Sequence, residues 1–261
     1  MNISLIITTY NSPQYLLLVL KSLDVQTIFP KEVVIADDGS DSETYEIINT
    51  YKKNSTLKVI HSWQKDKGFR AARSRNKAIL KTNSEYIVMI DGDTLLHPRF
   101  IEDHLNAAEL GCFTQGSRVL VSKNKAHKIL NNMYEPISFL SIGLKNRKNM
   151  IHSNFLSKTL SKQKNTIRGI KTCNMGFYKK DCLKVNGFNN EFEGWGREDS
   201  EFVVRLINSG INRKNIKFSA IQFHLWHEAS SSLFLEKNNL LLDTAITQKL
   251  KKCSFGISQL L

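Results

Sequence analysis

The chain contains no long hydrophobic run that could cross a membrane. None of its segments approaches the roughly eighteen uncharged apolar residues that such a span requires. The amino terminus leads directly into a strand-like segment, residues 3–8, with no basic leader before it. We therefore expect a cytoplasmic protein, and 261 residues are enough to bury a substantial core in one compact unit.

Cysteine is also scarce, and its spacing argues against two kinds of site. The chain has four cysteines, which are widely spaced and show no paired zinc-ligand spacing: Cys112, Cys173, Cys182 and Cys253. A disulfide framework and a structural zinc site are therefore not expected. We interpret the four side chains as reduced structural thiols.

Acidic residues are rare in one segment, residues 118–184. This segment holds 15 Lys and Arg against two acids, Glu135 and Asp181, whereas the rest of the chain holds 22 charges of each sign. The whole net charge of +13 therefore comes from this segment. Such a segment can attract nucleic acid, an anionic membrane surface or a phosphorylated acceptor. No nucleic-acid-binding motif accompanies it, so we expect no nucleic-acid partner. A solvated, Lys- and Asn-rich surface is the alternative.

Strand-like and helix-like segments alternate through the first third of the chain. This alternation predicts βαβ units, and hence an α/β fold with a mostly parallel central sheet flanked by helices. Short apolar, β-branched runs predict strands at residues 3–9, 32–36, 57–61 and 85–90. The segments between them predict helices at residues 13–23, 42–53 and 68–80.

Polar residues follow three of these predicted strands. Asp91 and Asp93 come directly after the last one, and residues 9–11 and the pair Asp37 and Asp38 follow the first two. Because the carboxyl ends of parallel strands share one edge of a sheet, we expect these residues to line one crevice. Two carboxylates one residue apart suit Mg²⁺ or Mn²⁺, whose coordination substrate phosphates complete. An ordinary Asp-Gly turn is the alternative.

The second half of the chain carries two further polar groups. Glu198 and Asp199 fall in the first turn of a predicted helix, where exposed backbone N–H groups stabilise negative charge. His224 and His227 lie near a predicted strand end, and a neutral imidazole can bind an ion of the Mn²⁺ class. For either histidine alone, a hydrogen-bonded structural role is the alternative.

The remaining segments give weaker predictions. Residues 122–168 are polar and weakly periodic, which favours short helices and mobile segments, and residues 172–178 predict a strand. Residues 238–261 hold leucines and lysines with one acid, Asp243. We expect a helical tail at residues 236–261 that meets the core, a partner subunit or a membrane surface.

Taken in their order and spacing, several motifs resemble the family 2 glycosyltransferases, which are nucleotide-sugar enzymes of the GT-A (Rossmann-like) fold. The motifs of the first half are Thr8-Thr9-Tyr10-Asn11, Asp37-Asp38-Gly39-Ser40, Gly68-Phe69-Arg70-Ala71-Ala72-Arg73-Ser74-Arg75-Asn76 and Asp91-Gly92-Asp93. The second half is similar to the galactosyltransferase-type module of chondroitin-polymerase-like enzymes. It runs from Asn174-Met175-Gly176-Phe177 through Gly187-Phe188 to Gly194-Trp195-Gly196-Arg197-Glu198-Asp199-Ser200-Glu201.

The resemblance covers residues 1–230 and implies a domain organisation. A GT-A domain would span residues 1–235, with a nucleotide-sugar-binding half at 1–115 and an acceptor-binding and catalytic half at 116–235. The helical tail at 236–261 would follow it. Arg197 departs from the commonest form of the motif, which has Gly there, so the acceptor specificity of relatives does not transfer directly.

The resemblance also implies a role for each matched residue. The residues that would bind the nucleotide-sugar are Thr9, Tyr10, Asn11, Asp37, Asp38, Arg70, Arg75, Asp91 and Gly92. The metal ion, Mn²⁺ or Mg²⁺, would be bound by Asp93 with His227 or His224, of which we favour His227. The acceptor would contact Trp195, Glu198 and Asn174. Asp199 would be the catalytic base, with Glu198 beside it.

Elementary chemistry supports the same assignment. Breaking a sugar–diphosphate bond develops negative charge on the phosphate, which a divalent cation at Asp93 would stabilise. The incoming hydroxyl loses a proton, so a carboxylate such as Asp199 on the opposite face of the sugar can act as general base. A single displacement of this kind inverts the anomeric carbon. The expected reaction moves a sugar from a UDP-sugar to a saccharide acceptor, which could be lipid-linked or phosphorylated. We expect it to belong to the synthesis of a bacterial surface polysaccharide or lipo-oligosaccharide.

Two other functions and a second location stay open. A sugar nucleotidyltransferase also uses paired acids, but it usually carries a Gly-rich, Arg-containing loop where this chain has Thr-Thr-Tyr-Asn-Ser. A non-catalytic protein that binds carbohydrate or a membrane surface would explain the basic segment. That segment also suggests peripheral attachment of the enzyme at the inner face of the plasma membrane.

Overall fold

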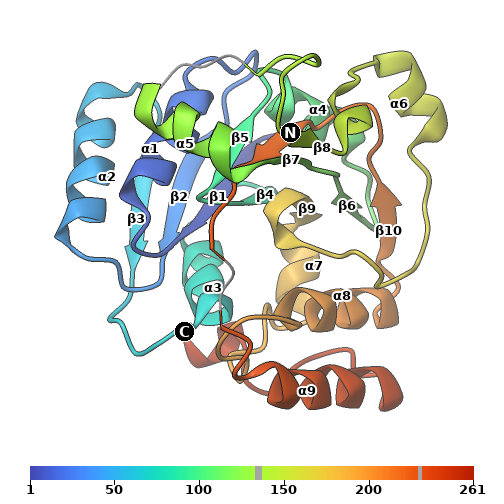
Figure 1. The fold of residues 1–261 in the computed structure, drawn as a ribbon. Helices are drawn as coiled ribbons and strands as arrows, with labels where there is room; N and C mark the ends of the chain where they lie inside the picture. Colours follow the sequence, from blue (N-terminus) through green and yellow to red (C-terminus); the bar gives the residue numbers. More distant parts are fainter. Residues whose placement is uncertain (133–136, 229–230) are drawn as a thin grey trace.

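The computed structural model describes residues 1–132, 137–228 and 231–261. Its centre is a seven-stranded sheet in the order β10-β6-β9-β4-β1-β2-β3 (Figure 1). The strands in chain order are β1 (Ile3–Thr9), β2 (Glu32–Asp37), β3 (Val59–Trp63), β4 (Tyr86–Asp91), β6 (Cys112–Gln115), β9 (Met175–Tyr178) and β10 (Asn212–Asn215). Only β9 pairs antiparallel with its neighbours in this sheet, so the predicted, mostly parallel sheet is confirmed.

Helices pack on both faces of this sheet. One face is covered by α1 (Pro13–Leu23), α2 (Ser42–Asn54) and α4 (Phe100–Ala107), and the other by α3 (Ala71–Lys81), α7 (Lys179–Lys184) and α8 (Glu198–Asn208) (Figure 1). Successive side chains of a strand point to opposite faces of the sheet, so a strand of apolar residues must be covered by helices on both faces. In β1, Leu5 and Ile7 join the first helical layer, whereas Ile6 joins the second, and all three are fully buried.

Some element boundaries differ from the predictions. The basic helix α3 begins at Ala71 rather than at residue 68. Gly68 has a φ of +83°, and the backbone N–H of Arg70 donates to Asp38 Oδ2 at 2.6 Å, so both residues serve a turn instead. The predicted strand at 172–178 begins only at Met175, because residues 172–174 form a 3-10 turn, η2 (Thr172–Asn174).

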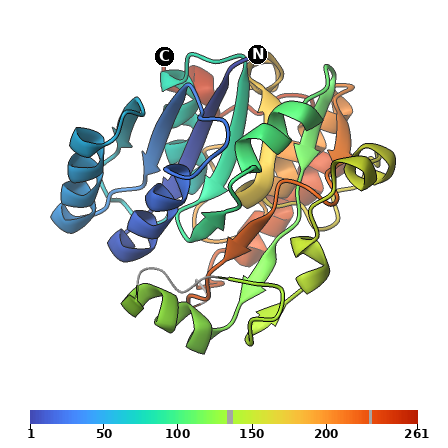
Figure 2. The same cartoon turned by 90° about the horizontal axis from the view of Figure 1, so that it is seen from above.

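A smaller sheet lies beside the end of the larger one. Its four strands, in the order β5-β11-β7-β8, are β5 (Thr94–Leu96), β11 (Gln222–His224), β7 (Val119–Val121) and β8 (Leu144–Lys145) (Figure 2). Because β5 follows β4 after a short turn and pairs with β11, the sheet brings His224 opposite Thr94. The smaller sheet therefore joins the predicted histidine segment to the Asp-Gly-Asp turn.

The middle of the chain forms the short helices that we predicted. They are α5 (Lys123–Asn132), η1 (Arg147–Met150) and α6 (Asn154–Leu160). In the described part of the chain, no helix combines the length and the apolar character that crossing a membrane would take.

The carboxyl-terminal residues fold back on the domain. They form α9 (Leu235–Thr247) and a short 3-10 turn, η3 (Ile257–Gln259). Leu242 and Ala245 pack against Val204 of α8, and Ile257 joins the core layer that contains α3. These contacts join the tail to the core, and its contact with a partner subunit or a membrane surface stays a prediction. The boundaries at residues 115 and 235 stay predictions, and both predicted halves contribute strands to the larger sheet.

Candidate active site

Arg75 on α3 joins the two acidic motifs. Its Nη1 donates to Glu198 Oε1 at 3.1 Å and to Asp199 Oδ1 at 3.2 Å, and its Nη2 lies 3.8 Å from Asp91 Oδ1. The guanidinium is almost fully buried, which disfavours its charge, but the three carboxylates outweigh this and raise the pKa of Arg75. A permanent positive charge therefore holds the end of β4 against the start of α8.

Asp199 is held in place by a second group, Thr172 in η2. Asp199 Oδ2 accepts from the Thr172 backbone N–H at 2.9 Å, and Oδ1 accepts from the Thr172 hydroxyl at 3.0 Å. Together with Arg75, these contacts fix both carboxylate oxygens. A carboxylate fixed in this way can accept a proton from a substrate hydroxyl without first reorienting.

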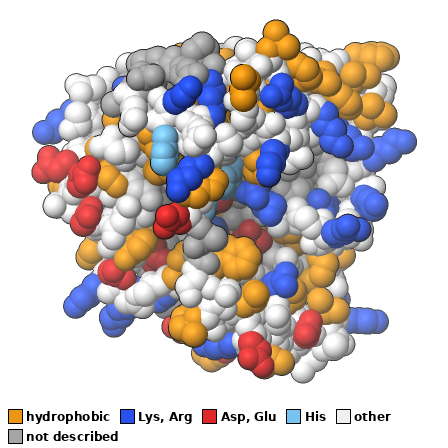
Figure 3. Space-filling model, in the orientation of Figure 1, with side chains coloured by type: hydrophobic (Ala, Val, Ile, Leu, Met, Phe, Trp, Pro, Cys, Tyr) orange, Lys and Arg blue, Asp and Glu red, His pale blue; other side chains and the backbone are white. Residues whose placement is uncertain are grey.

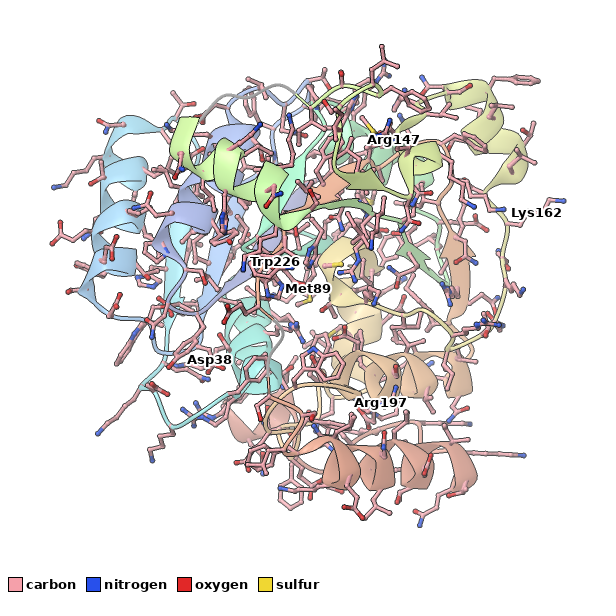
Figure 4. All side chains as sticks on the ribbon, in the orientation of Figure 1. Asp38, Met89, Arg147, Lys162, Arg197 and Trp226 are labelled. Carbon is pink, nitrogen blue, oxygen red and sulfur yellow. The ribbon has the colours of Figure 1, made fainter. Side chains whose placement is uncertain are left out.

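The turn before α8 explains how the two acids reach this place. Gly194, Gly196 and Arg197 all have positive φ angles, of +67°, +105° and +78°. At Gly194 an added Cβ would also lie 2.5 Å from the Phe234 ring, so the turn requires glycine there. Arg197 occupies a backbone conformation that favours glycine, and its Nε donates to Asn239 Oδ1 at 2.7 Å. The arginine therefore points toward α9 (Figure 4).

The Asp91-Gly92-Asp93 turn is fixed by its neighbours. The Gly92 N–H donates to Thr8 O at 2.8 Å, and a Cβ at Gly92 would lie 3.0 Å from that oxygen, so glycine lets β4 and β1 approach closely. The backbone oxygen of Asp93 accepts from the Leu225 N–H at 2.9 Å. This bond brings the residues after β11 beside Asp93.

Asp93, His224 and His227 form a cluster that fits a metal ion. Asp93 Oδ2 lies 3.0 Å from His227 Nε2 and 3.7 Å from His224 Nε2, and one ligand atom from each residue lies within 4.8 Å of the others. Ligands about 2.1 Å from an octahedral ion lie roughly 3 to 4 Å apart, so little movement would be needed. One carboxylate and two imidazoles suit a Mn²⁺-class ion.

Burial and crowding shift the pKa values of the acids. Burial, followed by the charge of Asp93, raises the pKa of Asp91 to about 7 against the opposing effect of Arg75. Burial also favours the neutral form of Asp93, but the hydrogen bond from His227 and the charges of both histidines outweigh it and lower the pKa of Asp93. The bond with Asp93 raises the pKa of His227 to about 9. Burial and then Asp199 raise the pKa of Glu198.

Residues 9–11 lie at the end of β1, beside these acids. The Thr9 hydroxyl is buried and has no hydrogen-bond partner among the described residues. The Tyr10 ring is half exposed, and its hydroxyl donates to Asp66 Oδ2 at 2.9 Å. Asn11 has a φ of +42°, and its Oδ1 accepts from the Asp41 N–H at 2.9 Å. The orphaned hydroxyl and the accessible ring are compatible with the predicted nucleotide pocket, which stays a prediction.

Asp37 stabilises the turn at the end of β2. It is fully buried, and its Oδ1 accepts from the N–H groups of Gly39 at 3.1 Å and Ser40 at 2.8 Å. Its Oδ2 lies 2.8 Å from His61 Nε2. Burial alone would raise the pKa of Asp37, but the bonds with His61 and Ser40 lower it. These contacts fix the turn that presents Asp38.

Asp38 joins that turn to the start of α3. Its Oδ1 accepts from Gln64 Nε2 and its Oδ2 from the Arg70 N–H, both at 2.6 Å, and burial raises the pKa of Asp38. The Arg70 side chain donates to Lys65 O at 2.5 Å. Asp38 thus lies beside α3, away from Arg197 (Figure 4). The nucleotide contacts that we expect of Asp37, Asp38 and Arg70 stay predictions.

The structure brings Trp195 to the surface but keeps Asn174 in the interior. The Trp195 ring is half exposed at the turn before α8, where a sugar ring can pack on it. Asn174 is buried; its Nδ2 donates to Ser117 O and Ala220 O at 2.9 Å, and its Oδ1 lies 2.9 Å from His104 Nε2. Its side-chain amide is therefore engaged within the protein, and the acceptor contact that we expect of Asn174 stays a prediction.

Thr172 was not among the predicted site residues, and Arg75 was predicted to have a different partner. We expected Arg75 to approach the nucleotide, and that contact stays a prediction beside its observed contacts with Asp91, Glu198 and Asp199. Thr172 is 27 residues from Asp199 in the chain, and no local motif marks it.

Comparisons with known proteins match most of the chain. The profile of Glycosyl transferase family 2 matches residues 4–185, and that of the N-terminal domain of galactosyltransferase matches residues 155–228. Chondroitin synthase from Escherichia coli is 25% identical over 243 residues, which cover 85% of this chain and 34% of that protein. Hyaluronan synthase from Pasteurella multocida is 28% identical over 234 residues, which cover 82% of this chain and 24% of that protein. The chain therefore spans about a third or less of the length of these relatives.

Solved structures match the fold. Residues 1–349 of S. aureus TarS superpose with a TM-score of 0.67 at 17% identity, covering 99% of this chain and 68% of that one. Its complex with UDP superposes with a TM-score of 0.65 at 18% identity, with the same coverage. This likeness confirms the predicted GT-A fold. Because the first family profile covers more than half of the sequence, the chain belongs to glycosyl transferase family 2.

Proposed function

We propose that this chain is a metal-dependent, inverting glycosyltransferase that moves a sugar from a UDP-sugar to a saccharide hydroxyl. The observation that carries the proposal is the joining of two acidic motifs at one sheet edge. Asp91 at the end of β4 and Glu198 and Asp199 at the start of α8 all meet Arg75. Asp93 stands beside Asp91 with two histidines within reach of the same ion.

Each residue of the candidate site would have a separate role in the reaction. Asp199, fixed by Thr172 and Arg75, would accept the proton of the acceptor hydroxyl as the new bond forms. Asp93, with His227 and His224, would hold the divalent cation, which when bound supplies positive charge for the leaving diphosphate. Glu198 and Trp195 would orient the acceptor sugar. A direct attack opposite the leaving group would invert the anomeric centre.

Two facts support UDP-sugar as the donor. S. aureus TarS, which shares the fold, has been solved in complex with UDP and with UDP-GlcNAc. The Thr9 hydroxyl, which has no partner among the described residues, and the accessible Tyr10 ring lie at the carboxyl end of β1, where α/β sheets bind nucleotides. The names of the relatives further favour the synthesis of a bacterial surface polysaccharide or lipo-oligosaccharide.

A donor-hydrolysis screen tests the proposal. The chain is incubated with UDP-galactose, UDP-N-acetylgalactosamine, UDP-glucose and UDP-N-acetylglucosamine, with Mn²⁺ or with EDTA, and UDP release is measured. We expect release from at least one donor, at least tenfold faster with Mn²⁺ than with EDTA. UDP binding without release would favour a non-catalytic binding protein. Release of UTP from a sugar nucleotide and pyrophosphate would instead identify a nucleotidyltransferase.

We also propose that one surface attaches the protein to an anionic membrane, at the inner face of the plasma membrane. Leu140, Ile142 and Phe155 are 84%, 89% and 75% exposed, which is unusual for large apolar side chains. They belong to residues 137–160, which contain four Lys or Arg and no acid. Figure 3 shows hydrophobic side chains gathered over α6 with Lys and Arg side chains beside them. Apolar side chains that insert into the bilayer, with basic side chains beside them that attract anionic headgroups, suit binding to an anionic lipid surface.

Sedimentation with liposomes tests this attachment. We expect the protein to bind vesicles that contain phosphatidylserine, and to bind less as salt rises, because ions screen the lysines. The double change Leu140→Ser with Ile142→Ser should lower the partition coefficient at least tenfold, since each buried side chain contributes about 1.5 to 3 kcal/mol. Leu240→Ser on α9, another exposed leucine, is the matched control. Equal binding by the double variant and the control would contradict the proposal.

A further inference from the structure

A pocket of about 690 Å³ opens beside the acidic site. It lies between the two sheets, at the ends of β6 and β10 and against β7 and β11, and the segment that leads into η2 forms one wall. Its volume lies within the range of about 300 to 1,000 Å³ that is usual for ligand pockets. None of the four acids of the candidate active site lines this pocket: Asp91, Asp93, Glu198 and Asp199.

The described lining of this pocket is positively charged. Five cations line it, and none of its described lining residues is acidic: Arg118, Lys148, Lys171, Arg213 and Lys217. Lys148, Lys171 and Lys217 are exposed at the surface, Arg118 is partly buried and Arg213 is buried. Figure 3 shows Lys and Arg side chains around the hollowed centre of this face.

These cations form no close pair with an acid in the described part of the protein, although the charge of Arg118 also acts to lower the pKa of Asp91. None of the five forms an ion pair with a described carboxylate. The Arg213 Nη1 donates to two backbone oxygens, and its Nε is buried without a described partner. Five cations that face one cavity repel one another, so an anionic ligand would relieve this repulsion.

The pocket adjoins the residues that hold the candidate base. Cys173 lines it, and the neighbouring Thr172 donates both of its hydrogen bonds to Asp199. Arg118 Nη1 lies 4.0 Å from Cys173 Sγ. Burial, and then the charge of Asp91, raises the pKa of the Cys173 thiol to about 12, so the thiol stays neutral and leaves the positive charge of the pocket intact. The pocket wall at Cys173 is therefore next in the chain to the residue that holds Asp199.

We propose that this pocket binds an anionic group, phosphate or carboxylate, that the acceptor saccharide carries next to its reacting hydroxyl. The proposal rests on the proposed function, because it places the acceptor beside Asp199. A cation held by the Asp93 cluster would serve the donor diphosphate, which would leave the positive charge of the pocket for the acceptor. The lysines at the rim would attract the anion, and Arg118 would meet it deeper in the pocket.

Calorimetric titration with three matched probes tests the proposal. The probes are a neutral disaccharide, the same disaccharide with a phosphate, and the same disaccharide oxidised to a uronic acid; each is titrated into the full chain saturated with UDP and Mn²⁺. We expect at least one anionic probe to bind at least tenfold more tightly than the neutral one. The anionic probe that binds more tightly distinguishes a phosphorylated acceptor from a uronate acceptor.

Charge-removing variants localise the effect. The double change Lys148→Gln with Lys217→Gln should abolish the preference for the anion. The double change Lys52→Gln with Lys53→Gln removes the same charge from the exposed surface of α2 and should leave the preference intact. Equal binding of all three probes to the wild-type chain, or an equal loss in both double variants, would overturn the proposal. UDP release by the wild-type chain is measured separately, so a failure of the proposed function is recognised independently.

Discussion

Asp199→Asn should lower the rate of sugar transfer by about 10³, because the amide cannot accept the proton of the acceptor hydroxyl. General-base catalysis typically contributes about 10² to 10⁴ in rate. The substitution preserves the shape of the side chain. The amide oxygen at the Oδ2 position can still accept from the Thr172 N–H, and the amide N–H at the Oδ1 position can donate to the Thr172 hydroxyl, while the bond from Arg75 to Oδ1 is lost. The affinity for UDP should therefore stay within about twofold of the wild type. The measurement compares transfer kinetics with UDP binding for the same preparation.

Two further observations make the Asp199 result decisive. Asp243→Asn makes the same chemical change at an exposed position of α9 and should leave the transfer rate unaltered. The product of the wild-type enzyme should carry the anomeric configuration opposite to that of the donor, as read by NMR. Unchanged turnover in Asp199→Asn would remove the carboxylate from the role of base. Retention of the donor's configuration would contradict a single displacement.

Local sequence patterns predicted most of the fold. The strand β1 and the helix α1 have the predicted bounds, since a β-branched run and a proline at the first helical position are strong local signals. The alternating order of strands and helices was enough to predict the parallel sheet. The start of α3 was predicted too early, because the signal that ends the preceding turn is a bond from Arg70 to Asp38, 32 residues away.

The candidate residues of the site were easier to predict than the contacts between them. Asp91, Asp93 and Asp199 were chosen as candidates because each lies in a short motif at an element end, and their roles stay predictions. The bonds that orient them join residues far apart in the chain, such as Arg75 and Asp199, which are 124 positions apart. Local periodicity carries no information about such contacts, so only the fold could reveal the link.

Asn174 shows that a motif residue can also have a packing role. The residue belongs to a motif that resembles a functional module, and we expected it to contact the acceptor. In the structure its side-chain amide donates to two backbone oxygens, and its amide oxygen lies close to a buried histidine. These contacts join the residue before β9 to the neighbouring loops. A buried polar side chain needs such partners, because an unpaired amide in the interior costs about 1 to 3 kcal/mol. A residue of a motif can therefore contribute to packing as well as to binding.

Replacing Asp93 should produce the second large effect. Asp93→Ala removes the only carboxylate of the described Asp93, His224 and His227 cluster and leaves two imidazoles, which bind a divalent ion more weakly without the negative charge. We expect sugar transfer to fall by at least 10³, which corresponds to about 4 kcal/mol of transition-state stabilisation. The increase in UDP affinity on adding Mn²⁺ should also be lost. Calorimetry with UDP, with and without EDTA, measures this difference.

The controls for Asp93 separate metal binding from damage to the turn. UDP affinity in EDTA should be the same for Asp93→Ala and wild type, because the Gly92 N–H and the Asp93 backbone oxygen keep their bonds to Thr8 and Leu225. His227→Ala should weaken Mn²⁺ binding, measured by electron paramagnetic resonance, more than His224→Ala does, since His227 lies closer to Asp93 Oδ2. A variant Asp93→Ala that still gains UDP affinity from Mn²⁺ would place the metal elsewhere. In that case the carboxylate of Asp91, 33% exposed, would become the next candidate ligand to replace.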